Sequence, residues 1–244
     1  MIIKRMINNI KRIMPISNEK YIKQLRDKGA KIGKNTVFFS PRKTIVDEGK
    51  AFLITIGDYC KITSGVTILA HDYSRSVLRY YYGDNIGGSS PVKIGNNCFL
   101  GINAIILMGT VIGNNCIVGA GSVVKGTFPE NSVIAGNPAR IICNLEEFHY
   151  KRQNRVLQEA CNCVLACKEN TGKSPTISQM GDGFAWLYTP HNQDTIEEYP
   201  AFFNLVGDDC DSIREKFLNT KPLFESYKDF LTYAESKNNE DKES

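Results

Sequence analysis

The sequence predicts a parallel β-helix as the main domain, flanked by α-helices at both ends. An aliphatic residue recurs every six positions between Ile94 and Val124, and glycine follows it in four of the six units. A six-residue period fits neither an α-helix nor a β-hairpin, and glycine inside a helix costs about 1 kcal/mol per site. Three hexapeptides instead form one triangular coil, and successive coils stack at the roughly 4.8 Å spacing of paired strands.

The same phase continues toward the N-terminus and sets the expected domain boundaries. It returns at Ile56, Ile62 and Ile68 and, more faintly, at Ile32. A segment rich in arginine, tyrosine and glycine then interrupts the repeat, so we expect an excursion loop that leaves the β-helix there. The expected organisation is a helical segment at 1–30, the β-helix at 31–142 with its loop at 73–91, a helical extension at 143–236 and a disordered tail at 237–244.

Both flanks carry helical patterns. Apolar residues from Ile2 to Met14 fall at helical spacing with lysine and arginine interleaved, and this helix ends before Pro15. Such a helix could rest on an anionic membrane surface or pack on a neighbouring subunit. A second short helix is expected from Asn18 to Gly29, and two more near residues 208–218 and 222–235.

Composition excludes several classes of protein. The net charge is only +4 and no basic run covers a face, so we expect no nucleic-acid partner. No apolar stretch reaches the roughly 20 residues that span a bilayer, and the N-terminus has no apolar core followed by a small-residue cleavage site. We therefore expect a cytoplasmic protein, at the inner face of the membrane if the N-terminal helix binds lipid. The eight cysteines lack the spacing of a zinc site, and we expect reduced thiols and no metal.

The repeat carries a family resemblance. The run VKIGNNCFLGINAIILMGTVIGNNCIVGAGSVVKGTFPENSVIAGNPARII, residues 92–142, resembles the hexapeptide-repeat acyltransferases, especially the sugar and polysaccharide O-acetyltransferase branch, with galactoside and serine acetyltransferases as similar members. The resemblance covers somewhat over half of the chain. It implies left-handed coils, a homotrimer, and acetyl-CoA as the acyl donor without a metal.

His71 is the only histidine of the expected β-helix and stands directly before the excursion loop. It also matches the position of the family's catalytic histidine. A neutral imidazole can take the proton of an alcohol as the oxygen attacks a thioester carbonyl, which contributes on the order of 10² to 10⁴ in rate. We therefore predict that His71 is the general base. Asp72 is the nearest carboxylate by sequence to orient the ring, and a backbone carbonyl is the alternative.

The resemblance also names residues for the two substrates. Relatives bind the donor in a groove between subunits, and the matching donor-binding positions are Gly101, Ala120, Lys125 and Arg140. Aromatic faces and guanidinium groups suit sugars and anionic ligands. For the acceptor we therefore predict Asp47 in the segment TIVDEG, together with Arg75, Arg79, Tyr80 and Tyr82 in the loop.

The expected function is transfer of an acetyl group from acetyl-CoA to a sugar hydroxyl in a glycan of the capsule or lipopolysaccharide type. An N-acyltransferase acting on an amino sugar nucleotide uses a similar fold and base and stays an alternative. A non-catalytic β-helix scaffold is a second alternative. A metal hydratase of similar fold needs three histidine ligands, which one repeat-domain histidine does not supply.

Overall fold

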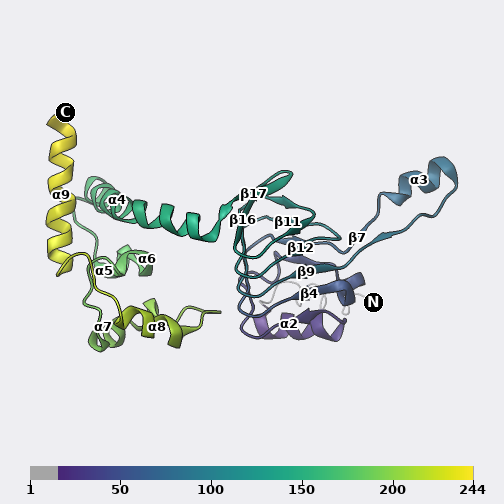
Figure 1. Cartoon of the computed structure of the whole chain (residues 1–244), viewed down its shortest axis with the longest axis horizontal. Helices are drawn as coiled ribbons and strands as arrows, with labels where there is room; N and C mark the ends of the chain where they lie inside the picture. Colours follow the sequence, from purple (N-terminus) through teal and green to yellow (C-terminus); the bar gives the residue numbers. More distant parts are fainter. Residues whose placement is uncertain (1–15, 244) are drawn as a thin grey trace, which may run out of the picture. The chain divides into compact units, whose positions relative to one another are not determined.

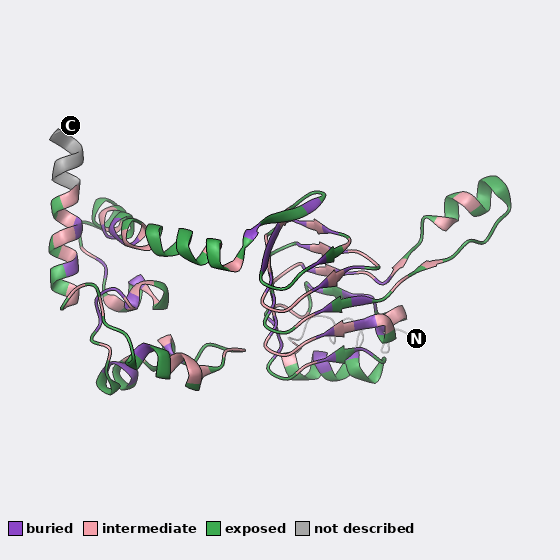
Figure 2. Cartoon of the chain, in the orientation of Figure 1, coloured by how far each residue is buried: buried purple, intermediate pink, exposed green. Residues whose placement is uncertain are grey.

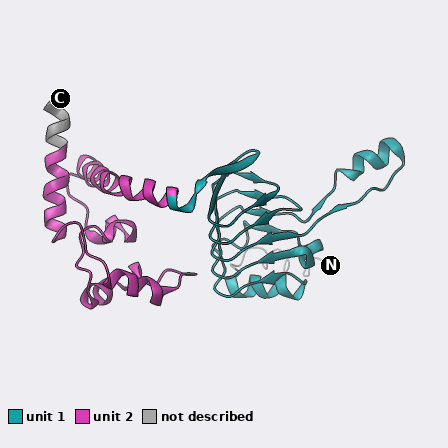
Figure 3. Cartoon of the chain, in the orientation of Figure 1, with its two compact units in different colours: residues 1–146 teal, residues 147–244 magenta. Residues whose placement is uncertain are grey.

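The chain forms two compact units, residues 1–146 and 147–244, and each is described by itself (Figure 3). The computed structural model describes residues 16–243, with side chains described as far as Lys237. The helix expected before Pro15 lies outside the described residues. Within those residues, none of the helices combines the length and the apolar character needed to cross a bilayer.

The first unit is a three-faced prism of short parallel strands, which confirms the predicted β-helix (Figure 1). The chain passes sheets A, B and C in turn, and each circuit stacks on the previous one in register. Sheet A holds β1 (Lys31–Ile32), β4 (Ile54–Ile56), β9 (Val92–Ile94), β12 (Val111–Ile112) and β15 (Thr127–Phe128). Sheet B holds β2 (Val37–Phe38), β5 (Lys61–Ile62), β10 (Phe99–Leu100), β13 (Ile117–Val118), β16 (Ser132–Gly136) and β17 (Ala139–Asn144). Sheet C holds β3 (Ile45–Val46), β6 (Thr67–Ile68), β11 (Ile105–Ile106) and β14 (Val123–Val124).

The aliphatic residue of each hexapeptide fills the shaft of the prism, as the period predicts. Ile56, Ile62 and Ile68 are all buried, and they come from sheets A, B and C of one circuit. Figure 2 shows that buried segments recur along the strands of the prism. The compact residues fill the corners, where Cys98 and Cys116 are buried and each thiol donates to a carbonyl of the next coil. The core is therefore one continuous column whose residues repeat every circuit.

Asparagines hold the corner between sheets A and B. Asn97, Asn115 and Asn131 adopt φ values of 52°, 55° and 59°, a left-handed conformation that asparagine tolerates better than most residues. Their side chains form a ladder, with Nδ2 to Oδ1 distances of 3.0 Å from Asn97 to Asn115 and 3.1 Å from Asn115 to Asn131. The ladder keeps successive coils aligned at this corner.

Both ends of the prism are covered. Helix α2 (Asn18–Asp27) lies at the first coil, with its N-terminus capped by the Ser17 hydroxyl, and it confirms the helix predicted from Asn18. The 3₁₀ segment η1 (Glu48–Leu53) joins sheet C to sheet A in the first circuit. At the other end, β17 turns back antiparallel on β16 and closes sheet B.

The excursion at 73–91 is more ordered than the loop predicted for it. Strand β7 (His71–Asp72) pairs antiparallel with β8 (Gly88–Ser89), and between them stands α3 (Arg75–Tyr82). The resulting arm projects away from the prism, and no residue of α3 is buried (Figure 1). The sequence did not predict this helix because it has no apolar face that packs on the prism.

The second unit is helical, as its periodicity predicts. It contains α4 (Leu145–Thr171, which begins in the first unit), α5 (Ile177–Met180), α6 (Asp182–Ala185), α7 (Gln193–Glu198), η2 (Pro200–Phe202), α8 (Cys210–Leu218) and α9 (Tyr227–Glu243). Tyr188 and Phe230 stack in one buried cluster, and Phe203 and Phe217 pack around Trp186 in another. Helix α9 ends at Glu243, within the stretch from Lys237 that the sequence predicts as a tail.

Candidate active site

The corner between sheets C and A, called here the site corner, brings Asp47, His71 and Lys125 to one edge of the prism. Asp47 follows β3, His71 begins the arm in β7, and Lys125 follows β14. The Asp47 carboxylate contacts the imidazole Nδ1 of His71 through Oδ2, and the same oxygen accepts the backbone N–H of Ala70 at 3.1 Å. The carboxylate therefore fixes both the ring and the backbone that carries it.

Burial separates the roles of the two side chains. The Asp47 side chain is 3% exposed and the His71 side chain 36% exposed, so only the imidazole can meet a ligand from solvent. With Nδ1–H donating to Asp47, the neutral ring keeps its lone pair on Nε2. The pair therefore presents a basic nitrogen on an imidazole ring whose tautomer and orientation are fixed by the Asp47 carboxylate.

Asp72 does not orient the ring, which corrects the role predicted for it. Its two carboxylate oxygens accept the backbone N–H and the hydroxyl of Ser74, both at 2.7 Å, and these bonds lower the Asp72 pKa below its usual value. Both Asp72 oxygens are thus engaged by Ser74, whereas Nδ1 of the ring is held by Asp47. Asp47, predicted as an acceptor-binding residue, takes the orienting position instead.

The repeat alone does not identify this pair. Val46 and Ile68 are Cα partners on adjacent coils of sheet C, so Asp47 lies beside the coil that leads to His71 although the two are 24 positions apart in sequence. Regular coils pair residues 18 positions apart, such as Ile105 and Val123, whereas this circuit is longer because it contains η1. Counting one regular circuit back from His71 therefore misses Asp47, and looking only at sequence neighbours identifies Asp72.

A cavity of about 320 Å³ opens at the site corner. Its wall is mainly apolar, with polar groups from the imidazole, the Asp72 carboxylate and the Lys125 ammonium. The full lining is Leu69, His71, Asp72, Tyr73, Leu107, Met108 and Lys125. Lys125, predicted for the donor, thus lies beside His71. A small polar substrate in contact with His71 would also meet this cation.

The other predicted donor residues lie on different parts of the prism. Gly101 and Ala120 share the corner between sheets B and C, called here the donor corner, and a Cβ on Gly101 would come within 2.5 Å of the Ala120 nitrogen. Gly101 is therefore required by the close stacking of coils. Arg140 lies on β17, where its guanidinium donates to the Ala139 carbonyl at 2.9 Å. In one chain, the width of sheet C separates the donor corner from His71.

The arm residues predicted for the acceptor are not gathered at the base. Arg79, Tyr80 and Tyr82 lie on α3, which the arm carries away from the prism (Figure 1). Arg75 lies at the start of α3, 4.9 Å from the ring of Tyr73, which lines the site cavity. Of these four residues, only Arg75 is linked to the His71 cavity through a described contact.

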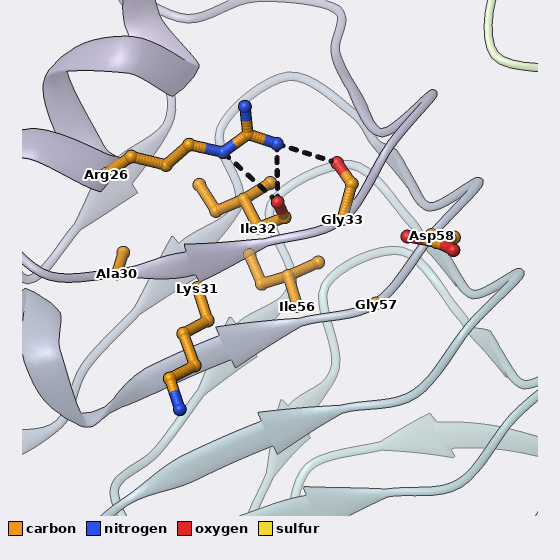
Figure 4. Close-up of a pocket in the computed structure, with 8 residues that line it drawn as sticks. All are labelled: Arg26, Ala30, Lys31, Ile32, Gly33, Ile56, Gly57 and Asp58. Atoms are coloured by element: carbon orange, nitrogen blue, oxygen red, sulfur yellow. Dashed lines mark hydrogen bonds between the residues drawn. The ribbon is translucent and has the colours of Figure 1, made fainter.

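A second cavity, of about 460 Å³, lies at the first coil under α2 (Figure 4). The Arg26 guanidinium donates there to the carbonyls of Ile32 and Gly33 and so fastens the helix to the prism. No group of three or more histidine, cysteine or acidic side chains in the described part of the chain could hold a metal ion.

Comparison with known proteins agrees with this architecture. The family described as the hexapeptide repeat of succinyl-transferase matches residues 91–125. Protein CapG of Staphylococcus aureus is 43% identical over 129 residues, which cover 52% of this chain and 73% of that protein. The chain therefore belongs to the hexapeptide-repeat acyltransferases, as its sequence predicts.

Two further matches have more specific names. The putative lipopolysaccharide biosynthesis O-acetyl transferase WbbJ of Escherichia coli K12 is 37% identical over 124 residues, covering 45% of this chain and 61% of WbbJ. A solved galactoside acetyltransferase in complex with coenzyme A aligns with 56% of this chain and 76% of its own, at 27% identity and a TM-score of 0.42. The relatives that show the family thus make the chain an acyltransferase by class.

Proposed function

We propose that this protein transfers an acetyl group from acetyl-CoA to a hydroxyl group of a sugar, with His71 as general base. The observation that carries the proposal is the buried Asp47 behind a partly exposed imidazole, because this arrangement leaves a basic Nε2 facing a cavity. Membership of the acyltransferase family and the O-acetyl transferase name of WbbJ support the same chemistry.

In the proposed reaction, His71 Nε2 takes the proton of the acceptor hydroxyl while the hydroxyl oxygen bonds to the thioester carbonyl carbon. The carbonyl electrons move onto oxygen, and their return breaks the bond to the CoA sulfur. The imidazolium, stabilised by Asp47, gives its proton to the departing thiolate. The products are the acetyl ester and CoA thiol, and the neutral imidazole is regenerated without a covalent enzyme intermediate.

We infer that the working site lies between two copies of the chain in a homotrimer. Gly101 and Ala120 lie at the donor corner and His71 at the site corner, so one prism does not bring these residues around one thioester. A cyclic assembly can place the site corner of one subunit against the donor corner of the next. Each site would then take its base and its donor contacts from different subunits.

Mixing two inactive variants tests the shared site. His71→Ala removes the base, and Ala120→Glu places a charge at the donor corner. If each site combines two subunits, a site is intact when its base comes from the Ala120→Glu chain and its donor corner from the His71→Ala chain. In random mixed assemblies this holds for about a quarter of the sites, so activity returns on co-refolding. Absence of any return, with mixed oligomers shown by native mass spectrometry, would place the whole site within one chain.

An acceptor screen tests the activity itself. Thiol release from acetyl-CoA is followed with sugars, oligosaccharides and amino sugar nucleotides, and the acetylated product is treated with hydroxylamine. A sugar ester releases its acetyl group, whereas an amide does not. Cleavable product supports O-acetylation, and stable product from an amino sugar would identify the N-acyltransferase instead. No acceptor-dependent release from a protein that binds acetyl-CoA would favour a scaffold.

A further inference from the structure

The outer face of sheet A carries positive charge without compensating carboxylates. The strand register aligns one outward residue from each coil, in the order Lys31, Thr55, Lys93, Val111 and Thr127. The alternate residues, such as Ile56 and Ile94, are buried in the shaft. The row therefore contains two lysines and no acid.

These lysines have no partner among the residues that the structure describes. Between residues 16 and 243, where contacts are described, neither Lys31 nor Lys93 forms an ion pair or a side-chain hydrogen bond, and both are exposed. They lie two coils apart, about 10 Å at the usual strand spacing. Figure 4 shows that the Lys31 side chain extends away from the Arg26 guanidinium, so the two cations do not share one set of acceptors.

The charged face begins beside the catalytic base. His71 pairs with Ser89 at the foot of the arm, and only four residues separate Ser89 from Lys93, at most about 13 Å of chain. Lys125 lies in the His71 cavity at this edge of sheet A. A linear ligand with one hydroxyl at His71 can therefore continue across sheet A and pass Lys93.

The face ends at the second cavity, which also carries net positive charge. Arg26 and Lys31 line this cavity of about 460 Å³ together with Asp58 (Figure 4). One oxygen of Asp58 accepts the backbone N–H of Lys34 at 2.8 Å, so this carboxylate already has a partner in the corner. Two cavities thus stand at the ends of one basic face.

We propose that the acceptor is an acidic oligosaccharide, carrying carboxylate or phosphate groups, that lies across the outer face of sheet A from His71 toward Lys31. This proposal rests on the proposed function, because it takes His71 as the reacting end. Because Lys31 and Lys93 lie about 10 Å apart at the usual strand spacing, a ligand that contacts both must be extended. Lys93 and Lys31 then select anionic sugars by charge complementarity, which acts on binding more than on the chemical step.

Direct binding tests the proposal independently of catalysis. The full-length protein is titrated with fluorescently labelled oligogalacturonate and with its fully methyl-esterified form, which differs only in charge. We expect the acidic form to bind at least tenfold more tightly at low salt, and the preference to shrink as ionic strength rises. Lys93→Glu and Lys31→Glu should each weaken binding of the acidic form about tenfold and leave the ester unchanged.

Lys43→Glu is the matched control, because it makes the same charge change between β2 and β3, away from sheet A. It should leave both affinities as in the wild type, and unchanged melting curves show that the variants are folded.

Equal affinity for the acidic and esterified forms would overturn the proposal. The proposal would also be overturned if Lys93→Glu lost affinity for acetyl-CoA but still bound oligogalacturonate, because the lysine face would then bind the phosphates of the acetyl donor. If charge-dependent binding appears but no acceptor is acetylated, the proposed activity fails while the anionic site stands.

Discussion

Replacing Asp47 by asparagine removes one charge from the most buried part of the site while keeping nearly the same shape. In the wild type, Asp47 Oδ2 accepts from both His71 Nδ1 and the Ala70 backbone N–H. An amide oxygen can still accept both bonds, so the ring keeps its place, but the imidazolium that forms during the reaction loses its counter-charge. A hydrogen bond to a charged group is worth about 1.5–3 kcal/mol, which corresponds to a 10- to 150-fold lower kcat for Asp47→Asn.

The assay is the initial rate of thiol release with the best acceptor. The kcat should fall while KM for acetyl-CoA stays unchanged, because the substitution acts on the imidazolium formed during the reaction and not on donor binding. Glu48→Gln is the control, since it neutralises the adjacent carboxylate, which pairs with Lys28 and does not contact the ring. A wild-type kcat in Asp47→Asn would refute the view that Asp47 positions and supports His71.

Three further predictions concern the prism itself. Leu100→Ala removes a fully buried side chain from the shaft and should lower the free energy of unfolding by about 2–5 kcal/mol in urea titrations; a smaller loss would mean that the column is loosely packed. Gly101→Ala places a Cβ within 2.5 Å of the Ala120 nitrogen and should cost about 3 kcal/mol, and a wild-type melting temperature would contradict this close stacking. Burial raises the pKa of Tyr21 to about 12, so its contribution to stability is complete below pH 10 and lost as pH rises through 12. Tyr21→Phe should accordingly lose less stability than wild type between pH 10 and 12, and parallel curves would show that burial does not control this phenol.

The prism could be predicted from the sequence because its core is periodic. The buried positions from Ile56 to Ile68 and from Ile94 to Val124 recur every six residues, so a single pattern specifies register, inward face and corner without knowledge of long-range contacts. His71 could be proposed for a related reason, since it lies where the longest interruption of the pattern begins. Local periodicity and the position of this interruption therefore predict most of the fold and the candidate base.

The remainder of the site depends on stacking between coils, which neighbours in sequence do not reveal. Asp72 is adjacent to His71 in the chain, yet its carboxylate bonds Ser74, whereas Asp47 reaches the ring from the coil before. Residue type alone could not show whether the acceptor residues predicted on the arm lie near His71. Their distance from His71 depends on how far the paired strands β7 and β8 extend α3 from the prism. Tertiary geometry, and not residue type, decides both cases.

The most direct test of the account is the single-turnover rate of acetyl transfer in His71→Gln, measured with saturating acetyl-CoA and the acceptor that the screen identifies. Glutamine retains a hydrogen-bonding side chain but supplies no base. The account predicts unchanged acetyl-CoA affinity and a transfer rate reduced by about 10² or more. A His71→Gln rate equal to that of the wild type would show that His71 is structural and would contradict the central claim.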